Sequence, residues 1–331
     1  MTTALPVDFP DTAVESAVAE GLARVESVMR ETAQADEFLL TEASQYLMVA
    51  GGKRFRAMLV LLAAQFGDPE REQVVPAAAA IELTHLATLF HDDVMDEAAI
   101  RRGHASANSR WDNTVAILTG DFLFARASRI LADLGPEAIR IQTETFARLV
   151  SGQVAETIGP RPGEDPLDHY WRVVTEKTAS LIATSGRFGA MFSGAPENIV
   201  TGVEVACEAL GVAFQISDDI LDVCSETGQS GKTPGTDLRE GVKSLPVLYA
   251  LRSIDPADDR LRTLLTAGPL TSDADHAEAL ALLRAHPAVK ATHAEMTRWA
   301  DRAREQVMAL PAGPARTAFE KLCDFVVERT G

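Results

Sequence analysis

The residues most suited to chemistry are three aspartates at the end of an apolar segment: Asp92, Asp93 and Asp96. On a helix, Asp92 and Asp96 lie one turn apart on one face with Asp93 beside them, so three negative charges crowd together. Aspartate is also a poor residue for a helix interior, because its short side chain competes for backbone hydrogen bonds. Local stability therefore does not explain the cluster, which needs a bound cation.

A second triad with the same spacing follows later, in the apolar sequence FQISDDILD at 214–222: Asp218, Asp219 and Asp222. One D-D-x-x-D is weak evidence, because acidic helix faces are common and mostly solvated, but two of them are much stronger. Carboxylates offer only oxygen ligands, which suit a hard ion such as Mg²⁺ that completes its shell with water and substrate phosphates. The Cys and His spacing of a zinc site is absent. The sequence therefore predicts magnesium and an anionic substrate.

Basic side chains accompany both triads. They are Lys53, Arg56, Arg101, Arg102, Lys177, Lys232 and Lys243. Arginine forks and lysine point charges are the usual partners of phosphate oxygens. The chain has only six lysines, and four of them fall in these segments, although chance in an arginine-rich sequence is an alternative. We infer one diphosphate bridged by magnesium, with enough further basic residues for a second diphosphate held without metal.

The sequence GGKRFR at 51–56 places three cations, Lys53, Arg54 and Arg56, on the first turn of an apolar helix. Cations at this end of the helix dipole cost stability unless an anion sits there, and a bound anion would also meet the free amides of the first turn. The alternative is a solvated basic turn. The residues alone leave both readings open.

The composition places limits on location and partners. The chain has 331 residues and a formal charge of −17, which argues against a nucleic-acid partner. Its three cysteines lack disulfide or metal spacing, which suits a reducing cytoplasm. No basic region followed by an apolar stretch marks a signal peptide, and the longest apolar run, 57–64, is far short of the ~20 residues of a membrane span. We expect a soluble, cytoplasmic protein.

Helical periodicity predicts an all-α fold. The expected helices cover 11–30, 38–49, 73–96, 114–157 with a break at 135–136, 167–193 and 197–223, followed by further helical segments after 243. No stretch alternates with period two over strand length. Residues 225–242 are rich in Gly, Thr, Ser and Pro, and a loop of this kind is typical of an active-site lid. No low-complexity linker divides the chain, so we predict one large helical bundle over 1–331 with a mobile lid.

Five ordered motifs between residues 46 and 246 resemble those of the trans-prenyl diphosphate synthases, or polyprenyl synthetases. They are GGKRFR, HDDVMD with RRG at 91–103, EKT at 176–178, FQISDDILD, and GK with GTDLREG at 231–241. The resemblance implies a single all-α domain with a central cavity, the two aspartate motifs on facing helices, and a homodimer. It implies a prenyltransferase that joins isopentenyl diphosphate head-to-tail to an allylic diphosphate, giving an all-trans polyprenyl diphosphate.

The resemblance also implies a role for each motif residue. Magnesium, as three ions with substrate bound, would be contacted by Asp92, Asp96 and Asp218 with support from Asp93, Asp219 and Asp222. The diphosphate of isopentenyl diphosphate would be bound by Lys53, Arg56, His85 and Arg102. The allylic diphosphate would be held by Arg101, Lys177 and Lys232, with Lys243 as a further candidate. The developing carbocation would face Thr178 and Gln215.

The chain departs from the family pattern in three places. Ala57 and Ala105 stand where proline is common, which we expect to alter only local stiffness. In the lid, Val242 follows the glycine where the family often has lysine, and Lys243 comes next. One position is about 100° on a helix, so the role of Lys243 as a diphosphate ligand is an open question.

Side-chain size just before the first triad is expected to set product length, because the growing tail must run down from the aspartates between helices. Ala87 lies five residues before Asp92 and is small, where short-chain members that resemble farnesyl synthases place aromatics nearby. Thr88 is the neighbouring length position. Ala79 and Ala80, two turns deeper, are also small, and Phe146 is a candidate for the residue that closes the bottom of the cavity. We expect a product longer than fifteen carbons, such as a quinone tail, with a geranylgeranyl diphosphate synthase as the alternative.

Two other functions fit fewer of the motifs. A terpene cyclase would normally carry an asparagine-serine-glutamate metal motif in place of DDILD and would lack GGKR. A non-catalytic partner subunit of a synthase would usually lose aspartates, and all six are present. Both alternatives predict no elongated product.

Overall fold

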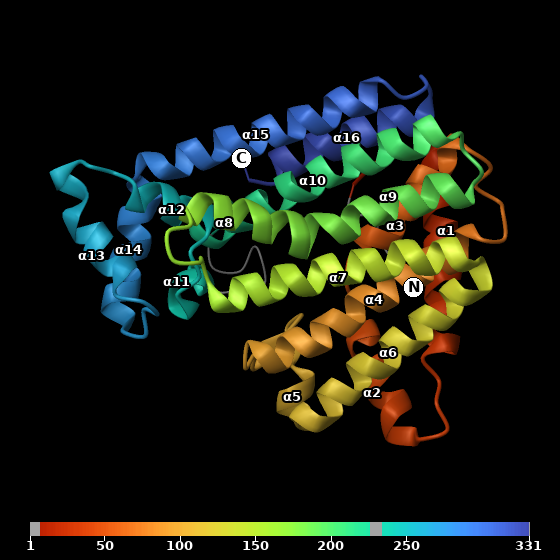
Figure 1. Ribbon diagram of the computed structural model, residues 1–331, viewed down its shortest axis with the longest axis horizontal. Coiled ribbons are helices and arrows are strands. Elements are labelled where there is room, and N and C mark those ends of the chain that lie inside the picture. Colours follow the sequence, from red (N-terminus) through yellow and green to blue (C-terminus); the bar gives the residue numbers. More distant parts are fainter. Residues whose placement is uncertain (1–6, 226–233, 331) are drawn as a thin grey trace. The chain divides into compact units, whose positions relative to one another are not determined.

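The structure, a computed structural model, describes residues 7–225 and 234–330 (Figure 1). Its regular structure is helical apart from one pair of two-residue strands, which confirms the all-α prediction. The helices up to the second aspartate triad are α1 (Thr12–Thr32), α2 (Phe38–Val49), α3 (Phe55–Ala63), η1 (Ala64–Phe66), α4 (Val74–Met95), α5 (Ala107–Arg110), α6 (Asn113–Leu134), α7 (Pro136–Ile158), α8 (Pro166–Val173), the π-helix η2 (Val174–Ala179), α9 (Ser180–Phe192) and α10 (Glu197–Cys224). Later in the chain come α11 (Thr236–Glu240), α12 (Leu245–Leu251), η3 (Pro256–Asp258), α13 (Asp259–Thr266), α14 (Asp273–Ala285), α15 (Pro287–Met308) and α16 (Pro314–Glu328).

The chain divides into two compact units. Unit 1 consists of Met1–Phe146, Leu181–Cys207 and Gln306–Lys321. Unit 2 consists of Ala147–Ser180, Glu208–Glu305 and Leu322–Gly331. The boundaries fall inside α7, α9, α10, α15 and α16, so continuous helices carry the chain from one unit to the other. The expected single domain over 1–331 stays a prediction.

The core of unit 1 is built around α4, which packs against α1, α3, α5 and α6. The first half of α4 is alanine-rich and buried, and small side chains of this kind let neighbouring helices approach closely. By length and composition α4 and α10 could each cross a membrane, but 67% and 61% of their most apolar windows are buried inside the protein. Core helices of soluble proteins pass the same test, so these two helices are weak evidence for a membrane span.

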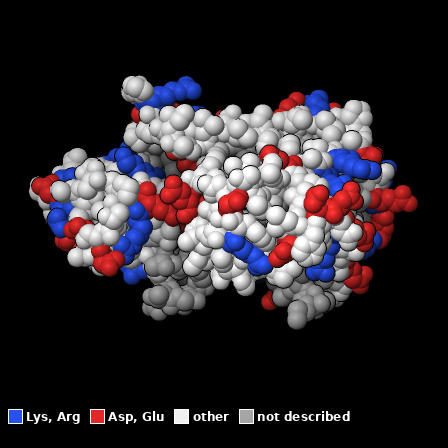
Figure 2. Space-filling model, turned by 90° about the horizontal axis from the view of Figure 1, so that it is seen from below, with Lys and Arg blue, Asp and Glu red and all other residues white. Residues whose placement is uncertain are grey.

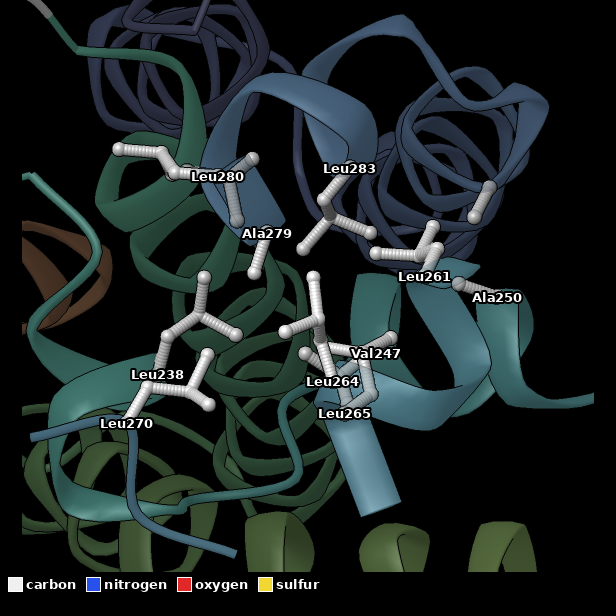
Figure 3. Packing of buried hydrophobic residues seen from close by; sticks show 12 residues of the cluster. Leu238, Val247, Ala250, Leu261, Leu264, Leu265, Leu270, Ala279, Leu280 and Leu283 are labelled. Carbon is white, nitrogen blue, oxygen red and sulfur yellow. The ribbon is translucent and has the colours of Figure 1, made fainter. Parts of the chain in front are cut away.

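Unit 2 contains two clusters of buried apolar side chains. One cluster joins α8, η2, α10 and α12, and includes Tyr170, Val174, Ile216, Ile220 and Leu245. The other joins the four short helices α11 to α14, whose side chains point toward one another in Figure 3: Leu238, Val247, Leu261, Leu264, Leu280 and Leu283. The end of α10 that carries the second aspartate triad is therefore held by apolar packing against α8 and α12.

The structure contains a strand pair that the sequence did not predict. Strands β1 (Ile100–Arg101) and β2 (His104–Ala105) pair antiparallel. They are joined by Arg102 and Gly103, with φ of 53° and 76°. Positive φ at both central residues is the signature of a tight hairpin turn. Strands of two residues are too short to show period-two alternation, so the pattern gave no signal for them.

The predicted lid and one predicted helix also differ locally. Residues 225–242 were expected to lack regular structure, but they contain α11, whose first amides, of Thr236 and Asp237, donate to the Asp222 carboxylate at 3.0 and 3.2 Å. Residues 226–233 lie outside the described part of the chain. The helix predicted over 167–193 is continuous, but its middle turn is the π-helix η2. The lid prediction itself stays untested.

The surface carries mixed charge. Figure 2 shows acidic and basic side chains interspersed with uncharged areas, without a continuous basic patch among the described residues on that face. Exposed large apolar side chains include Ile117 and Leu118 on α6, which are 42% and 57% exposed.

The approach of α9 to α3 in unit 1 depends on Gly189. A Cβ at this position would lie 2.1 Å from the carbonyl oxygen of Val60. We expect Gly189→Ala to lower the free energy of unfolding by about 2–3 kcal/mol, because the backbone contact must open. Gly202→Ala is the control, since its Cβ would meet only the end of the Leu310 side chain at 3.0 Å. Equal urea midpoints for the two variants would contradict this explanation.

Candidate active site

The first aspartate cluster, Asp92, Asp93 and Asp96, ends α4, and its members have different surroundings. Asp93 is fully buried, and its Oδ1 accepts a hydrogen bond from Arg101 Nε at 2.6 Å. Its Oδ2 accepts from the backbone N of Ala107 at 3.3 Å. The side chain of Asp96 is 47% exposed, and Arg101 Nη2 lies 3.9 Å from its Oδ2. Asp93 thus ties the hairpin and the start of α5 to α4, while Asp96 is open to solvent.

The glycine loop before α3 is fixed by Arg102. Gly51 and Gly52 have φ of 99° and 136°, which glycine adopts readily. A Cβ on Gly52 would lie 2.8 Å from Cζ of Arg102, so this position also needs glycine for space. Arg102 Nη1 donates to the carbonyl oxygen of Leu47 at 2.8 Å and to that of Gly51. Arg102 therefore holds the loop against the end of α2.

Arg54 has a structural role. It is only 2% exposed, its Nε donates to Glu26 Oε1 at 2.5 Å, and its Nη1 lies 3.7 Å from Glu82 Oε1. The buried Glu82 also accepts a hydrogen bond from the backbone N of Ala57 at 3.3 Å, in the first turn of α3. The alternative of a solvated basic turn is therefore wrong for Arg54. The Ala57 amide at the start of α3 therefore already has the Glu82 carboxylate as its acceptor, instead of a bound anion.

His85 lies among arginines. Burial lowers the pKa of His85 well below its usual value, and the charges of Arg56, Arg102 and Arg54 lower it further. Burial, together with the charge of Arg54, also lowers the pKa of Arg102 to about 10. His85 is therefore neutral near pH 7, and the guanidinium groups around it repel one another. A bound anion would relieve that repulsion.

The second aspartate cluster is Asp218, Asp219 and Asp222, in the last turns of α10. Asp219 is buried: its Oδ2 accepts from the Tyr170 hydroxyl at 2.7 Å and the Leu245 backbone N at 3.0 Å, and its Oδ1 from Gln215 Nε2 at 3.0 Å. Burial raises the pKa of Asp219 to about 6, although these hydrogen bonds oppose the shift. Burial and the charge of Asp219 raise the pKa of Tyr170 well above its usual value, so its hydroxyl remains a donor.

The outer members of this cluster have other partners. The side chain of Asp218 is 45% exposed and is paired with Arg329, whose guanidinium lies 4.4 Å from the ring centroid of Phe214. Asp222 is half-buried and caps α11 through the backbone N of Thr236 at 3.0 Å. A cationic side chain therefore already sits at one outer aspartate, and the other is bonded to the segment that follows residues 226–233.

Lys177 and Thr178 lie in the π-helix η2. The wider π turn is often found at functional sites, and here α7 approaches it closely through Gly152, where a Cβ would lie 2.5 Å from the backbone N of Lys177. Lys177 Nζ is paired with Glu156 of α7. Thr178 Oγ1 donates to Gln215 Oε1 at 2.9 Å. The structure therefore brings Thr178 and Gln215 into direct contact. Their expected role beside the carbocation stays a prediction.

The remaining predicted positions lie as follows. Lys53 and Lys243 are exposed, Arg56 is half-buried, and Lys232 lies outside the described residues. Ala87 and Thr88 are 2% and 9% exposed on α4, and the Thr88 hydroxyl donates to the carbonyl oxygen of His85 at 2.8 Å. The expected floor residue Phe146 packs on Phe124, with ring centroids 4.1 Å apart.

Sequence reasoning missed four residues that lie against predicted site residues, Gly152, Glu156, Tyr170 and Arg329, and it missed Glu82, which pairs with Arg54. None of them lies in a motif. Tyr170 is seven residues before Lys177, two helical turns along one face, and this spacing was the only available signal. Nothing in the sequence around Arg329 points to the aspartate with which it pairs.

The described carboxylates could bind a hard cation only together with water or substrate oxygens. No group of three or more His, Cys, Asp or Glu residues within 7–225 and 234–330 is arranged to hold a metal ion unaided. The outer aspartates offer carboxylate oxygens that are accessible to solvent, and Asp218 already pairs with a guanidinium. Magnesium is commonly bound by one or two carboxylates together with water and substrate phosphates, so these residues fit it.

Comparisons with known proteins decide the family. The family model for polyprenyl synthetase matches residues 37–283. The chain belongs to the polyprenyl synthetase family. It is 49% identical to the nonaprenyl diphosphate synthase of Mycobacterium tuberculosis, over 100% of this chain and 98% of the relative. This confirms the resemblance, and the protein is a chain-elongating prenyltransferase.

Solved structures of other polyprenyl synthetases have the same fold. The geranylgeranyl pyrophosphate synthase from Corynebacterium glutamicum, in complex with calcium and isoprenyl diphosphate, is 44% identical with a TM-score of 0.88, covering 98% of this chain and 100% of that one. A decaprenyl diphosphate synthase from Rhodobacter capsulatus is 35% identical with a TM-score of 0.87, covering 97% and 100%. These similarities span chains named for products of different length.

The lowered pKa of His85 predicts a dependence of stability on pH. The pKa of His85 is lower in the folded protein than in the unfolded chain. The contribution of neutral His85 to stability is therefore fully present above the unfolded pKa and is lost as the pH falls below it. From about pH 7.5 to about pH 5.5, the wild type should lose more unfolding free energy than His85→Gln, because the unfolded chain takes up the proton more readily than the folded protein. Urea unfolding at the two pH values measures this difference, and identical losses would contradict it.

Arg329 should compete with a divalent cation for Asp218. We expect Arg329→Gln to lower the MgCl₂ concentration at the midpoint of thermal stabilisation about two- to fivefold, because exposed ion pairs are weak. Arg304→Gln is the control, since Arg304 pairs with Asp324 at 2.7 Å. A midpoint equal to that of the wild type would show that Arg329 does not compete.

Proposed function

We propose that this protein condenses isopentenyl diphosphate head-to-tail with an allylic diphosphate and releases an all-trans polyprenyl diphosphate longer than fifteen carbons. The observation that carries the proposal is the common arrangement of the two aspartate clusters. In each, the middle aspartate is buried and bonded to protein groups, whereas Asp96 and Asp218 keep 47% and 45% of their side chains exposed. The resemblance assigns such outer carboxylates to magnesium, which would bridge them to a diphosphate.

The basic residues are assigned to two diphosphates. Isopentenyl diphosphate is held by Lys53, Arg56, Arg102 and neutral His85, and Arg54 is excluded from this set because Glu26 and Glu82 neutralise it. The allylic diphosphate is held by Arg101, Lys177 and Lys232, and the role of Lys243 stays open. Arg101 and Lys177 are oriented by carboxylates before any substrate binds, which reduces the entropy that binding would cost.

The reaction begins when the C1–O bond of the allylic diphosphate breaks and its electron pair leaves with the diphosphate. The double bond of isopentenyl diphosphate then attacks C1, a carbon–carbon bond forms, and a proton leaves to an oxygen of the departed diphosphate. Thr178 and Gln215 turn the negative ends of their dipoles toward the positive charge. Asp92, Asp96 and Asp218 would hold magnesium, which we propose as three ions, and the bound metal would supply positive charge to stabilise the leaving diphosphate.

We also propose a homodimer in the cytoplasm. The exposed apolar side chains of Ile117 and Leu118 on α6 support an interface with a second copy. Size-exclusion chromatography with light scattering tests this part, and a monomer at micromolar concentration would contradict it.

Product analysis tests the main proposal. Incubation of the wild type with magnesium, isopentenyl diphosphate and each allylic primer should yield products longer than fifteen carbons, read by chromatography after dephosphorylation. A product that stops at fifteen carbons would contradict the length assignment, and a product that stops at twenty would indicate a geranylgeranyl diphosphate synthase. No diphosphate release with any primer would contradict the function itself.

Ala87 is the residue expected to limit product length. It is 2% exposed, so Ala87→Phe should fill the space beside α4 and shorten the product by whole five-carbon units. Ala87→Leu should shorten it less, because leucine is smaller. Ala132→Phe on the exposed surface of α6 is the control and should leave the product unchanged. Identical products from all four proteins would show that Ala87 does not set the length.

A further inference from the structure

Tyr170 is a buried tyrosine that lies outside the five sequence motifs. It is 8% exposed on α8, within the apolar cluster that surrounds the second aspartate triad, and its ring packs edge-on against Trp171 at 5.0 Å. Its hydroxyl donates to Asp219 Oδ2 at 2.7 Å. A buried hydroxyl of this kind is costly without a partner, so the pair fixes both side chains.

Asp219 receives hydrogen bonds from three separate segments. The Tyr170 hydroxyl and the Leu245 backbone N both reach Oδ2, at 2.7 and 3.0 Å, and Gln215 Nε2 reaches Oδ1 at 3.0 Å. Because donors engage both carboxylate oxygens, the carboxylate plane cannot turn without breaking at least one hydrogen bond. Tyr170 and the first residue of α12 thereby set the position that Oδ1 presents to Gln215.

Gln215 has an amide whose two ends differ chemically. Its Nε2 donates to Asp219, and its Oε1 accepts from the Thr178 hydroxyl at 2.9 Å. Turning the amide over would place Oε1 against a carboxylate oxygen and break the hydrogen bond to Asp219, and Thr178 would then face the NH₂ group instead of the carbonyl oxygen. The orientation of Asp219 therefore decides that the carbonyl end of Gln215 faces Thr178.

We propose that Tyr170 is a positioning residue for prenyl transfer, acting through Asp219 to keep the carbonyl oxygen of Gln215 turned toward Thr178. A carbonyl dipole with its negative end toward a developing cation lowers the energy of the transition state, whereas an amide NH₂ in its place raises it. This step rests on the proposed function, in which Thr178 and Gln215 face the carbocation. Without the hydroxyl, the buried Oδ2 keeps only the Leu245 donor, so one hydrogen bond fewer opposes a turn of the carboxylate.

The test is Tyr170→Phe, which removes one oxygen and keeps the packed ring. We expect kcat to fall about ten- to a hundredfold, the loss of one hydrogen bond to a buried charge. The KM values for both diphosphates should stay within about twofold, because the charge-bearing ligands are unchanged. Tyr249→Phe is the control, since Tyr249 packs against the same apolar cluster, and it should keep the wild-type kcat.

A double-mutant cycle separates positioning from packing. In a Gln215→Leu background, Tyr170→Phe should change kcat by less than about twofold, because the group on which it acts is gone. Asp219→Asn, compared at saturating MgCl₂ because Asp219 also belongs to the proposed metal triad, should reproduce the kcat loss of Tyr170→Phe, and an undiminished kcat there would contradict the proposal if the tyrosine variant does not fold.

Three results would overturn the inference while leaving the proposed function intact: a wild-type kcat in Tyr170→Phe, additive losses in the cycle, or a KM increase that accounts for the whole effect. A wild type that makes no product would instead contradict the proposed function.

Discussion

The buried carboxylates of Asp93 and Asp219 determine how each aspartate cluster is arranged. A carboxylate removed from water must be met by donors, and here most of the donors come from other secondary-structure elements. Arg101 and the amide of Ala107 reach Asp93, while Tyr170 is among the donors to Asp219. One inward carboxylate on each helix end thereby fixes the loops and helices around it. The outer aspartates are carried on the same rigid turns and keep oxygens accessible to ligands.

Burial also determines which basic side chains need a carboxylate partner inside the protein. Arg54 is enclosed and needs two carboxylates, Glu26 and Glu82, to offset the cost of removing its charge from water. His85 is instead neutral, because burial and the charges of the arginines around it lower its pKa. The charge of Arg54 is therefore used inside the protein, and His85 adds no charge of its own.

The sequence predicted the all-α class, most helix ends and the residues of both aspartate clusters, because periodicity and motif spacing act over a few residues. It could not predict contacts made across long separations. Arg329 reaches Asp218 over 111 residues, and Tyr170 reaches Asp219 over 49. Nor could charge alone show that Arg54 is structural, because that role depends on where Glu26 and Glu82 lie in the fold. The β1–β2 hairpin was missed because its strands have two residues each.

Under the proposed function, two ion pairs of unit 2 would compete with ligands: Asp218 with Arg329, and Lys177 with Glu156. A divalent cation that takes Asp218 leaves Arg329 without its carboxylate, and a diphosphate that takes Lys177 displaces Glu156. Each ligand bound alone therefore leaves a charge uncompensated. When the cation and the diphosphate bind together, the released guanidinium of Arg329 and the diphosphate have opposite charge. Binding of either ligand would therefore lower the free-energy cost of binding the other. Because such coupling is reciprocal, metal affinity and diphosphate affinity rise together by the same factor.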